Sequence, residues 1–281
     1  MKRSTLLFKS FLVSAFCVTC LTAGAQKLPN VQKTSQRAPA DIKIDGKATE
    51  WDNKFQAYNH ATDVFYTVSN DDYHLYLTVQ ATDQSIINKI MSGGITFTIN
   101  KAGKKNDKDG ISITYPLFDR KNRPVFGKFS KADAEKGLSI AANTGDSVMN
   151  AHNKMLGEKS KLVAVTGVPG LDTLISVYNE DGIKTAELFD SKGFYTYELA
   201  IDLKNLGLNV NDAAKFAYHI TLNGTNPFNI VNFKSPGNGD GGQTLSFAGS
   251  DNISAAKISL DIMQSSSSPT DFWGEYTLAR K

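Results

Sequence analysis

The sequence predicts an all-β fold: a jelly-roll-like antiparallel sandwich of two sheets, with one or two short helices. Many short segments alternate apolar and polar residues with a period of two, which is typical of strands buried on one face. Polar turns rich in Asn, Asp and Gly separate these segments, and helical patterns are few and short. Because each sheet then has one apolar face, the two faces must cover each other.

The chain begins with a segment typical of an export signal. Lys2, Arg3 and Lys9 supply positive charge, and the apolar run over 11–21 is too short to span a bilayer. The small residues Ala23–Ala25 then form a cleavage pattern. We therefore expect cleavage after Ala25 and a periplasmic, surface or extracellular location.

Cleavage would change the composition of the protein. Both cysteines, Cys17 and Cys20, lie in the signal, so the exported chain would contain no disulfide, catalytic thiolate or cysteine metal site. Removing the three signal cations from the 31 Lys and Arg leaves 28, which balance the 28 Asp and Glu. A neutral chain argues against nucleic acid as a partner, and no later segment is apolar enough to cross a membrane.

The remaining chain is expected to form one domain. Residues 26–40 contain scattered Gln, Lys, Pro and Ser, as in a flexible leader, and 41–281 carry the sandwich. Ile42 and Ile44 predict a first strand, which Asp45 and Gly46 end in a turn. Hairpins are then expected from 64–68 with 73–79, 95–99 with 111–115, and 174–178 with 183–189. Single strands are expected over 195–203, 216–222, 258–262 and 272–278.

Two segments predict helices. Thr82 or Asp83 can cap a helix over 84–91 that Gly93 and Gly94 end. A second helix is expected over 147–156, with Gly157 as its end.

Several segments together resemble a known group of modules. The opening sequence I-K-I-D-G-K-A-T-E-W gives a strand, an Asp-Gly turn and a Glu-Trp pair. The supporting segments are 64–83, F-Y-T-Y-E-L-A-I-D-L with the following L-G-L (194–208), and the closing F-W-G-E-Y-T-L (272–278). In this order they resemble the family 9 carbohydrate-binding-like, or DOMON-like, β-sandwiches, although Asp202 stands where the family usually has Pro. The resemblance implies a secreted binding module and structural calcium.

No motif in the chain carries a catalytic mechanism. The sequence lacks G-x-S-x-G, H-E-x-x-H and P-loop patterns, and its four histidines are widely separated. Glycoside hydrolysis needs two carboxylates across the scissile bond. The candidates are Glu50, Asp83, Glu187 and Glu198, but acids at turns and on solvent faces are ordinary. We therefore expect no enzyme activity, and an exported hydrolase is the weakest alternative.

Cofactor signals are weak. The turns 70–72 and 106–110 are rich in oxygen ligands of the kind calcium prefers, although ordinary hairpin-turn chemistry also explains them. A haem-binding DOMON module would need an axial pair such as Met and His, which lone residues of these types do not establish. The loop 237–242 resembles a phosphate cradle only in composition, and it predicts a flexible loop.

Sugar recognition uses exposed aromatic rings beside polar side chains. Trp273 lies out of phase with the apolar residues of its strand and therefore shares a face with Glu275. Tyr76 similarly falls on a polar face with His74. Family 9 modules clamp a sugar between two tryptophans. We assign Trp51 to the interior, so only Trp273 can serve in this way, and a tyrosine would have to supply the second ring.

The sequence therefore predicts a secreted, non-catalytic module that binds a carbohydrate or related small ligand through Trp273, Tyr76, His74 and Glu275. The main alternative is a structural or interaction protein of the cell envelope with the same sandwich.

Overall fold

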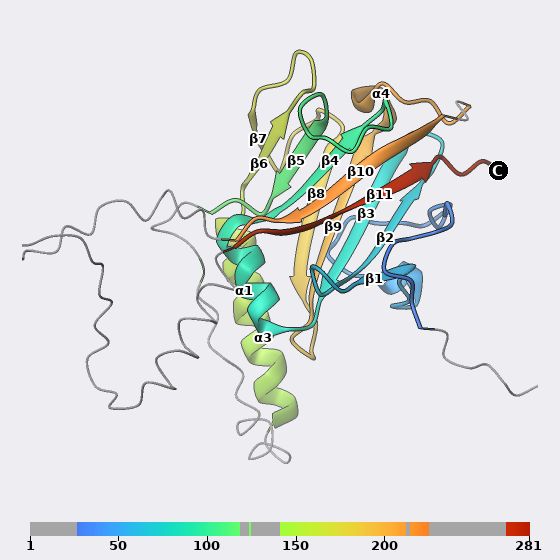
Figure 1. Ribbon diagram of the computed structural model, residues 1–281. Coiled ribbons are helices and arrows are strands. Elements are labelled where there is room, and N and C mark those ends of the chain that lie inside the picture. The colour runs from blue at the N-terminus through green and yellow to red at the C-terminus, as the bar shows by residue number, and fades with distance from the viewer. Residues whose placement is uncertain (1–26, 119–123, 125–140, 212–213, 225–267) are drawn as a thin grey trace, which may run out of the picture.

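Two antiparallel sheets face each other in the computed structural model, which describes residues 27–118, 124, 141–211, 214–224 and 268–281 (Figure 1). One sheet has the order β1 (Ala57–Asn59), β2 (Val64–Asn70), β3 (His74–Ala81), β9 (Tyr195–Asp202), β8 (Ile183–Phe189). The other has the order β11 (Thr270–Thr277), β10 (Lys215–Leu222), β4 (Ile95–Asn100), β5 (Ile111–Tyr115), β6 (Leu162–Thr166), β7 (Leu174–Ser176). The predicted all-β two-sheet sandwich is confirmed.

Residue alternation determines which side chains enter the core. In β9, Tyr197 and Leu199 point between the sheets and are fully buried in the main apolar cluster. Glu198 lies between them and points to the outer face, opposite Ala186 of β8. Strand β10 repeats the pattern, with Tyr218 inward and His219 outward. The alternation in these two strands therefore gives the correct faces.

The predicted hairpin of 174–178 with 183–189 is wrong, although both strands exist. Strand β7 pairs with β6, whereas β8 pairs with β9 in the other sheet. The intervening turn therefore carries the chain from one sheet to the other. Alternation identifies a strand and its faces but not its partner, which explains the error.

The opening segment is also not a strand. Ile42–Ile44 enter no ladder, and the segment lies across the outer face of the five-stranded sheet. The backbone N–H groups of Asp45 and Gly46 donate to Glu198 Oε2 at 3.0 and 2.9 Å. Gly46 has φ +82°, and a Cβ there would lie 2.7 Å from the backbone of Glu187, so the turn requires glycine. The predicted turn is thus present, but a buried carboxylate holds it.

Trp51 is buried, as expected, but outside the main core. It ends the short 3₁₀ helix η1 (Thr49–Trp51) and packs with Ala48 and Phe55 in a separate cluster. Ile42 and Phe65 pack against this cluster from the opening segment and β2. The opening sequence therefore forms a small second layer on the sheet.

The described part of the expected flexible leader is instead attached to the sandwich. The side-chain amide of Gln32 donates to Val68 O and accepts from Val68 N, both at 2.8 Å, as a neighbouring strand would. Gln36 N donates to the hydroxyl of Tyr276 at 3.0 Å, and Ala38 N donates to Asn70 O at 2.9 Å. These long-range hydrogen bonds leave no signal in the local composition.

The helices occupy the ends of the sandwich (Figure 1). Helix α1 (Gln84–Gly93) begins as predicted, with the Asp83 side chain accepting from two backbone N–H groups. Helix α3 (Ala141–Lys159) is longer than predicted and continues through Gly157. Helix α4 (Leu203–Leu206) follows β9 directly. No helix among the described residues is both long and apolar enough to cross a membrane, and the predicted strand 258–262 and loop 237–242 lie outside those residues.

Two carboxyl groups of the five-stranded sheet have raised pKa values, and they lie on opposite faces. Burial raises the pKa of Glu198 to about 7, and the hydrogen bonds from Asp45 and Gly46 offset this only in part. Burial likewise raises the pKa of Glu187 to about 7. Residue Glu187 is partly exposed because β8 is an edge strand, but its carboxyl group is enclosed and accepts from Tyr195 and Tyr115.

These pKa values predict that stability falls as pH rises from 4.5 to about 7. The unfolded chain loses these protons near pH 4.5, whereas the folded chain keeps them until about pH 7. The contribution of each group to stability is therefore fully present below pH 4.5, and about 2–3 kcal/mol of it has been lost once the pH reaches about 7. Urea midpoints across this range should show the decline. Glu187→Gln and Glu198→Gln should each make the decline of stability with pH shallower. An unchanged slope in both variants would contradict the assignment of this decline to the two carboxyl groups.

Glu198 also offers a test of the attachment of the opening segment. Glu198→Ala should lower the free energy of unfolding by about 2–4 kcal/mol, because two backbone N–H groups lose their acceptor under the opening segment. Glu198→Gln retains an acceptor oxygen and should cost clearly less at pH 7. Denaturation of the two variants side by side measures the difference, and in a Trp273→Phe background the tryptophan fluorescence reports on Trp51 alone.

Candidate functional site

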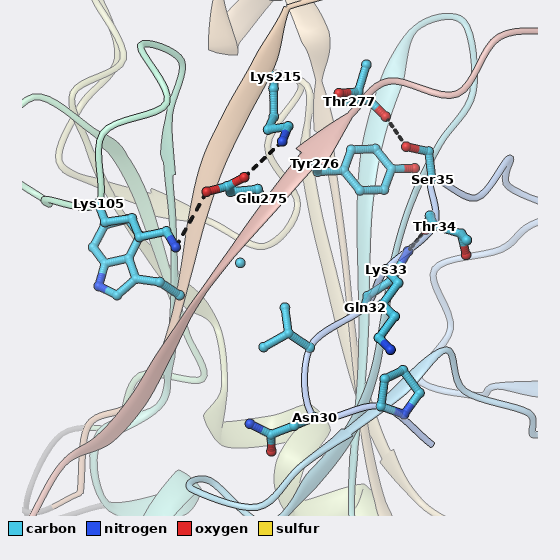
Figure 2. A pocket seen from close by; sticks show the side chains of 14 residues that line it. Asn30, Gln32, Lys33, Thr34, Ser35, Lys105, Lys215, Glu275, Tyr276 and Thr277 are labelled. Carbon is cyan, nitrogen blue, oxygen red and sulfur yellow. Dashed lines mark hydrogen bonds and ion pairs between the residues drawn. The ribbon is translucent and has the colours of Figure 1, made fainter. Parts of the chain in front are cut away.

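A groove of about 710 Å³ lies between β11 and residues 29–35. Two of the predicted residues, Trp273 and Glu275, line it from the outer face of β11. Lys105 and Lys215 line it beside them. Figure 2 shows these two lysines flanking Glu275, with the segment from Asn30 to Ser35 opposite.

The sequence of β11 determines which side chains reach the groove. Phe272 and Tyr276 are buried inward, so Trp273 and Glu275 point outward, as predicted. Gly274 lies between them on the inner face, above the ring of Tyr218. A Cβ at this position would lie 2.1 Å from Tyr218 Cζ, so the tyrosine occupies the space of the missing side chain.

Trp273 rests on a histidine that is itself fixed. The rings of Trp273 and His219 are parallel within 7° and their centroids lie 4.2 Å apart. His219 Nδ1 lies 2.9 Å from Asp107 Oδ1, and its Nε2 lies 2.9 Å from Asp271 Oδ1. The cationic ring can donate to both carboxylates. The His219 ring therefore covers one face of the indole. The opposite face and the edges of the indole remain accessible.

Sequence reasoning did not predict this stack. His219 and Trp273 are direct partners in the register of β10 and β11, but they are far apart in the chain. Only a correct pairing of the two strands would have placed them together. Asp107 comes from the oxygen-rich loop 106–110.

The charges of the groove lie close to Trp273. Lys215 Nζ lies 3.0 Å from Glu275 Oε2, and Lys105 Nζ lies 3.5 Å from Glu275 Oε1. The hydrogen bond from Lys215, followed by its charge and the contacts of Lys105, lowers the pKa of Glu275. Because all three side chains are largely exposed, these pairs orient polar groups more than they stabilise the fold.

The other two predicted residues, Tyr76 and His74, lie on the five-stranded sheet and not in this groove. They share the outer face, as expected, but Tyr76 is buried at 6% exposure, so its expected role as an exposed ring is wrong. The reason is the opening segment: Ile42–Ile44 line a cleft of about 340 Å³ over Tyr76 and His74. The structure therefore divides the four predicted residues between two sites.

A hydrogen-bond network surrounds His74. Its Nδ1 lies 3.2 Å from Asp71 Oδ2 and its Nε2 lies 3.2 Å from Asp202 Oδ1. Tyr76 donates to Asp71 Oδ2 at 2.7 Å. Burial acts to raise the pKa of Asp71, but hydrogen bonds from Tyr76, Tyr73 and His74 outweigh it and lower the pKa. Burial, followed by the bond to Asp71, raises the pKa of Tyr76.

The acidic candidates occupy different surroundings. Glu187 points between the sheets and Glu198 points outward, so the sheet separates their carboxyl groups. Asp83 caps α1, and Glu50 accepts from the neighbouring Thr49 hydroxyl. Glu50 lies near enough to Glu198 to contribute to its raised pKa, but Glu198 Oε2 is engaged by the N–H groups of Asp45 and Gly46.

The oxygen-rich turns engage protein groups. Asp71 accepts from the N–H groups of Tyr73 and His74, and Asp107 contacts His219. Within the part of the chain that the structure describes, no cluster of three or more His, Cys, Asp or Glu has a geometry suited to a metal ion.

A scan against protein-family models and a search of curated proteins found no match to this chain. The resemblance to family 9 carbohydrate-binding-like modules therefore stays a prediction from sequence.

Gly274 provides a test of how the groove is built. Gly274→Ala should reduce the free energy of unfolding by about 2–3 kcal/mol, because the added methyl group forces Tyr218 or β11 to move. Gly157→Ala is the matched control: no atom lies within 4 Å of that Cβ, and Ala favours the helix, so a small gain of about 0.5–1 kcal/mol is expected. Equal effects in the two variants, measured by urea denaturation, would contradict the close packing at Gly274.

Proposed function

We propose that this protein is a secreted, non-catalytic binding module whose groove beside Trp273 takes a carbohydrate or a related small polar ligand. The observation that carries the proposal is the partly exposed indole, held on His219, in a groove with charged and amide side chains. An oriented aromatic ring beside hydrogen-bonding groups is the arrangement that sugar recognition requires.

The two parts of the groove suit the two kinds of sugar surface. The accessible part of the Trp273 ring can pack against the C–H groups of a pyranose ring. Glu275, Lys105 and Lys215 can exchange their mutual contacts for hydroxyl groups of the ligand. Because His219 and its two carboxylates fix the indole before binding, little side-chain freedom would be lost on association.

The histidine clusters do not favour a hydrolase. Both ring nitrogens of His219 face carboxylate oxygens, and the same is true of His74. Each ring therefore has both nitrogens engaged by carboxylates of the protein. The separated faces of Glu187 and Glu198 argue against two-carboxylate glycoside hydrolysis.

One observation favours the second candidate, an interaction protein of the cell envelope. Leu162 and Leu174 lie on the outer face of the neighbouring strands β6 and β7 and are 42% and 51% exposed. Tyr178, which follows β7, is 75% exposed. An apolar surface of this kind suits contact with another protein, and Leu162→Lys would weaken such contact without affecting the Trp273 groove.

Binding to a panel of immobilised glycans tests the proposal. Trp273→Ala should weaken binding by about tenfold or more, because it removes the aromatic contact. Tyr178→Ala is the matched control, since it removes a more exposed ring from another surface and should leave glycan binding unchanged.

Three results would count against the function. Failure of the wild-type protein to bind any glycan, with retention of self-association or partner binding through Leu162, would favour the interaction protein. Equal losses of glycan binding in Trp273→Ala and Tyr178→Ala would show that the glycan does not bind in the Trp273 groove. Turnover of a glycan by the wild-type protein would contradict the non-catalytic assignment.

A further inference from the structure

A second cavity, separate from the Trp273 groove, lies on the five-stranded sheet. It has a volume of about 830 Å³ and is enclosed by three segments: the opening segment from Gly46 to Asn53, the turn between β8 and β9, and one face of α3. The Trp273 groove lies on β11 of the other sheet. The two spaces therefore share no lining residue.

The floor of this cavity is polar and fixed. Gln80 of β3 and Thr196 of β9 are paired across the strands, and Gln80 Nε2 donates to Thr196 Oγ1 at 3.1 Å. Both residues are buried, at 9% and 3% exposure, so backbone pairing and packing hold their side chains. Gln80 Oε1 remains available as an acceptor at the base of the cavity.

The walls are fixed as well. Asn153 of α3 accepts from Phe189 N at 2.7 Å and donates to Phe189 O at 2.9 Å, which attaches the helix to the edge strand β8. Asp190 Oδ1 accepts from the N–H groups of Lys192 and Phe194 and closes the turn between β8 and β9. The helix and turn are therefore positioned before any ligand arrives.

Side chains around the opening have free hydrogen-bonding capacity. No hydrogen bond joins the side-chain amides of Asn53 and Asn150 to other described residues. The ring of Phe194, only partly exposed, lies among these groups with Lys192 Nζ 5.9 Å from its centroid. The cavity thus combines amide groups, the carboxylate of Asp190, the ammonium groups of Lys47 and Lys192, and two aromatic rings, of which Phe194 is the more exposed.

We propose that this cavity is a second binding site for a neutral, polyhydroxylated ligand such as a sugar residue, and that the module is bivalent. Amides can donate to and accept from hydroxyl groups at once, and the Phe194 ring can contact the apolar side of the same sugar. The choice of ligand class rests on the proposed function, whereas the cavity and its free amides are independent of Trp273. Two sites on opposite sheets would let one molecule join two glycan chains and increase its apparent affinity.

An NMR titration of the ¹⁵N-labelled protein separates the two sites. The probes are D-glucose, D-galactose, D-mannose and D-xylose, each added to saturation. The side-chain amide of Gln80 reports on the cavity, and the indole N–H of Trp273 reports on the groove. With at least one sugar, we expect the Gln80 signal to shift in a saturable manner both in the wild type and in Trp273→Ala.

A double variant provides the matched test. Asn53→Gly suits the left-handed backbone at this position (φ +54°), and Asn150→Ala suits an exposed helix position. Together they should weaken the response of Gln80 by about tenfold and leave the response of Trp273 unchanged.

The outcomes are distinct for the two proposals. Shifts at Trp273 with none at Gln80 would overturn the second site and support the groove. Shifts at Gln80 with none at Trp273 would support the cavity and reject the groove. No shift at either reporter with any of the four sugars would overturn both sites for these ligands.

Discussion

The contact of Glu198 with the Asp45–Gly46 turn organises the outer side of the five-stranded sheet. A carboxyl group on the polar face of β9 accepts two backbone N–H groups, so the opening segment lies flat on the sheet and does not extend it. Gly46 permits this close approach because a side chain there would meet the backbone of β8. The segment covers the middle of the face, and a cleft remains on each side of it: one over His74 and one over Gln80.

The edges of the same sheet are closed by a related means. Gln32 pairs its amide with both backbone groups of Val68, beyond the end of the short β1, and Asn153 does the same with Phe189 of β8. Each amide supplies one donor and one acceptor, as a residue of a neighbouring strand would. An open strand edge can pair with another molecule, so these two side chains limit the unpaired backbone of the sheet. They also attach residues 29–35 and α3, which form the walls of the two proposed sites.

Structural features that depend only on neighbouring residues in the chain could be predicted from the sequence. Alternation predicts β9 and β10, as well as the outward direction of Trp273 and Glu275, because side chains in any strand point to opposite faces. It could not predict the separation of β7 from β8, since pairing depends on distant segments. The burial of Tyr76 has the same origin: its strand position is polar, but the opening segment covers it. The stack of His219 on Trp273 depends on the register of β10 with β11, and Asp107 reaches it from a third segment.

The two histidine clusters show that coverage, more than residue type, decides which aromatic ring can bind a ligand. His74 and His219 each lie on the outer face of a sheet between two aspartates, and each has an aromatic neighbour on the same face. At His74 that neighbour is Tyr76, which lies under the opening segment with its hydroxyl bound to Asp71. At His219 it is Trp273, which borders an open groove and has no hydroxyl to satisfy. Two similar His-Asp clusters therefore have different aromatic neighbours: Tyr76 is buried and part of the fold, whereas Trp273 is accessible to a ligand. The difference follows from the Glu198 contact, because that contact holds the covering segment over the first cluster while the second remains open.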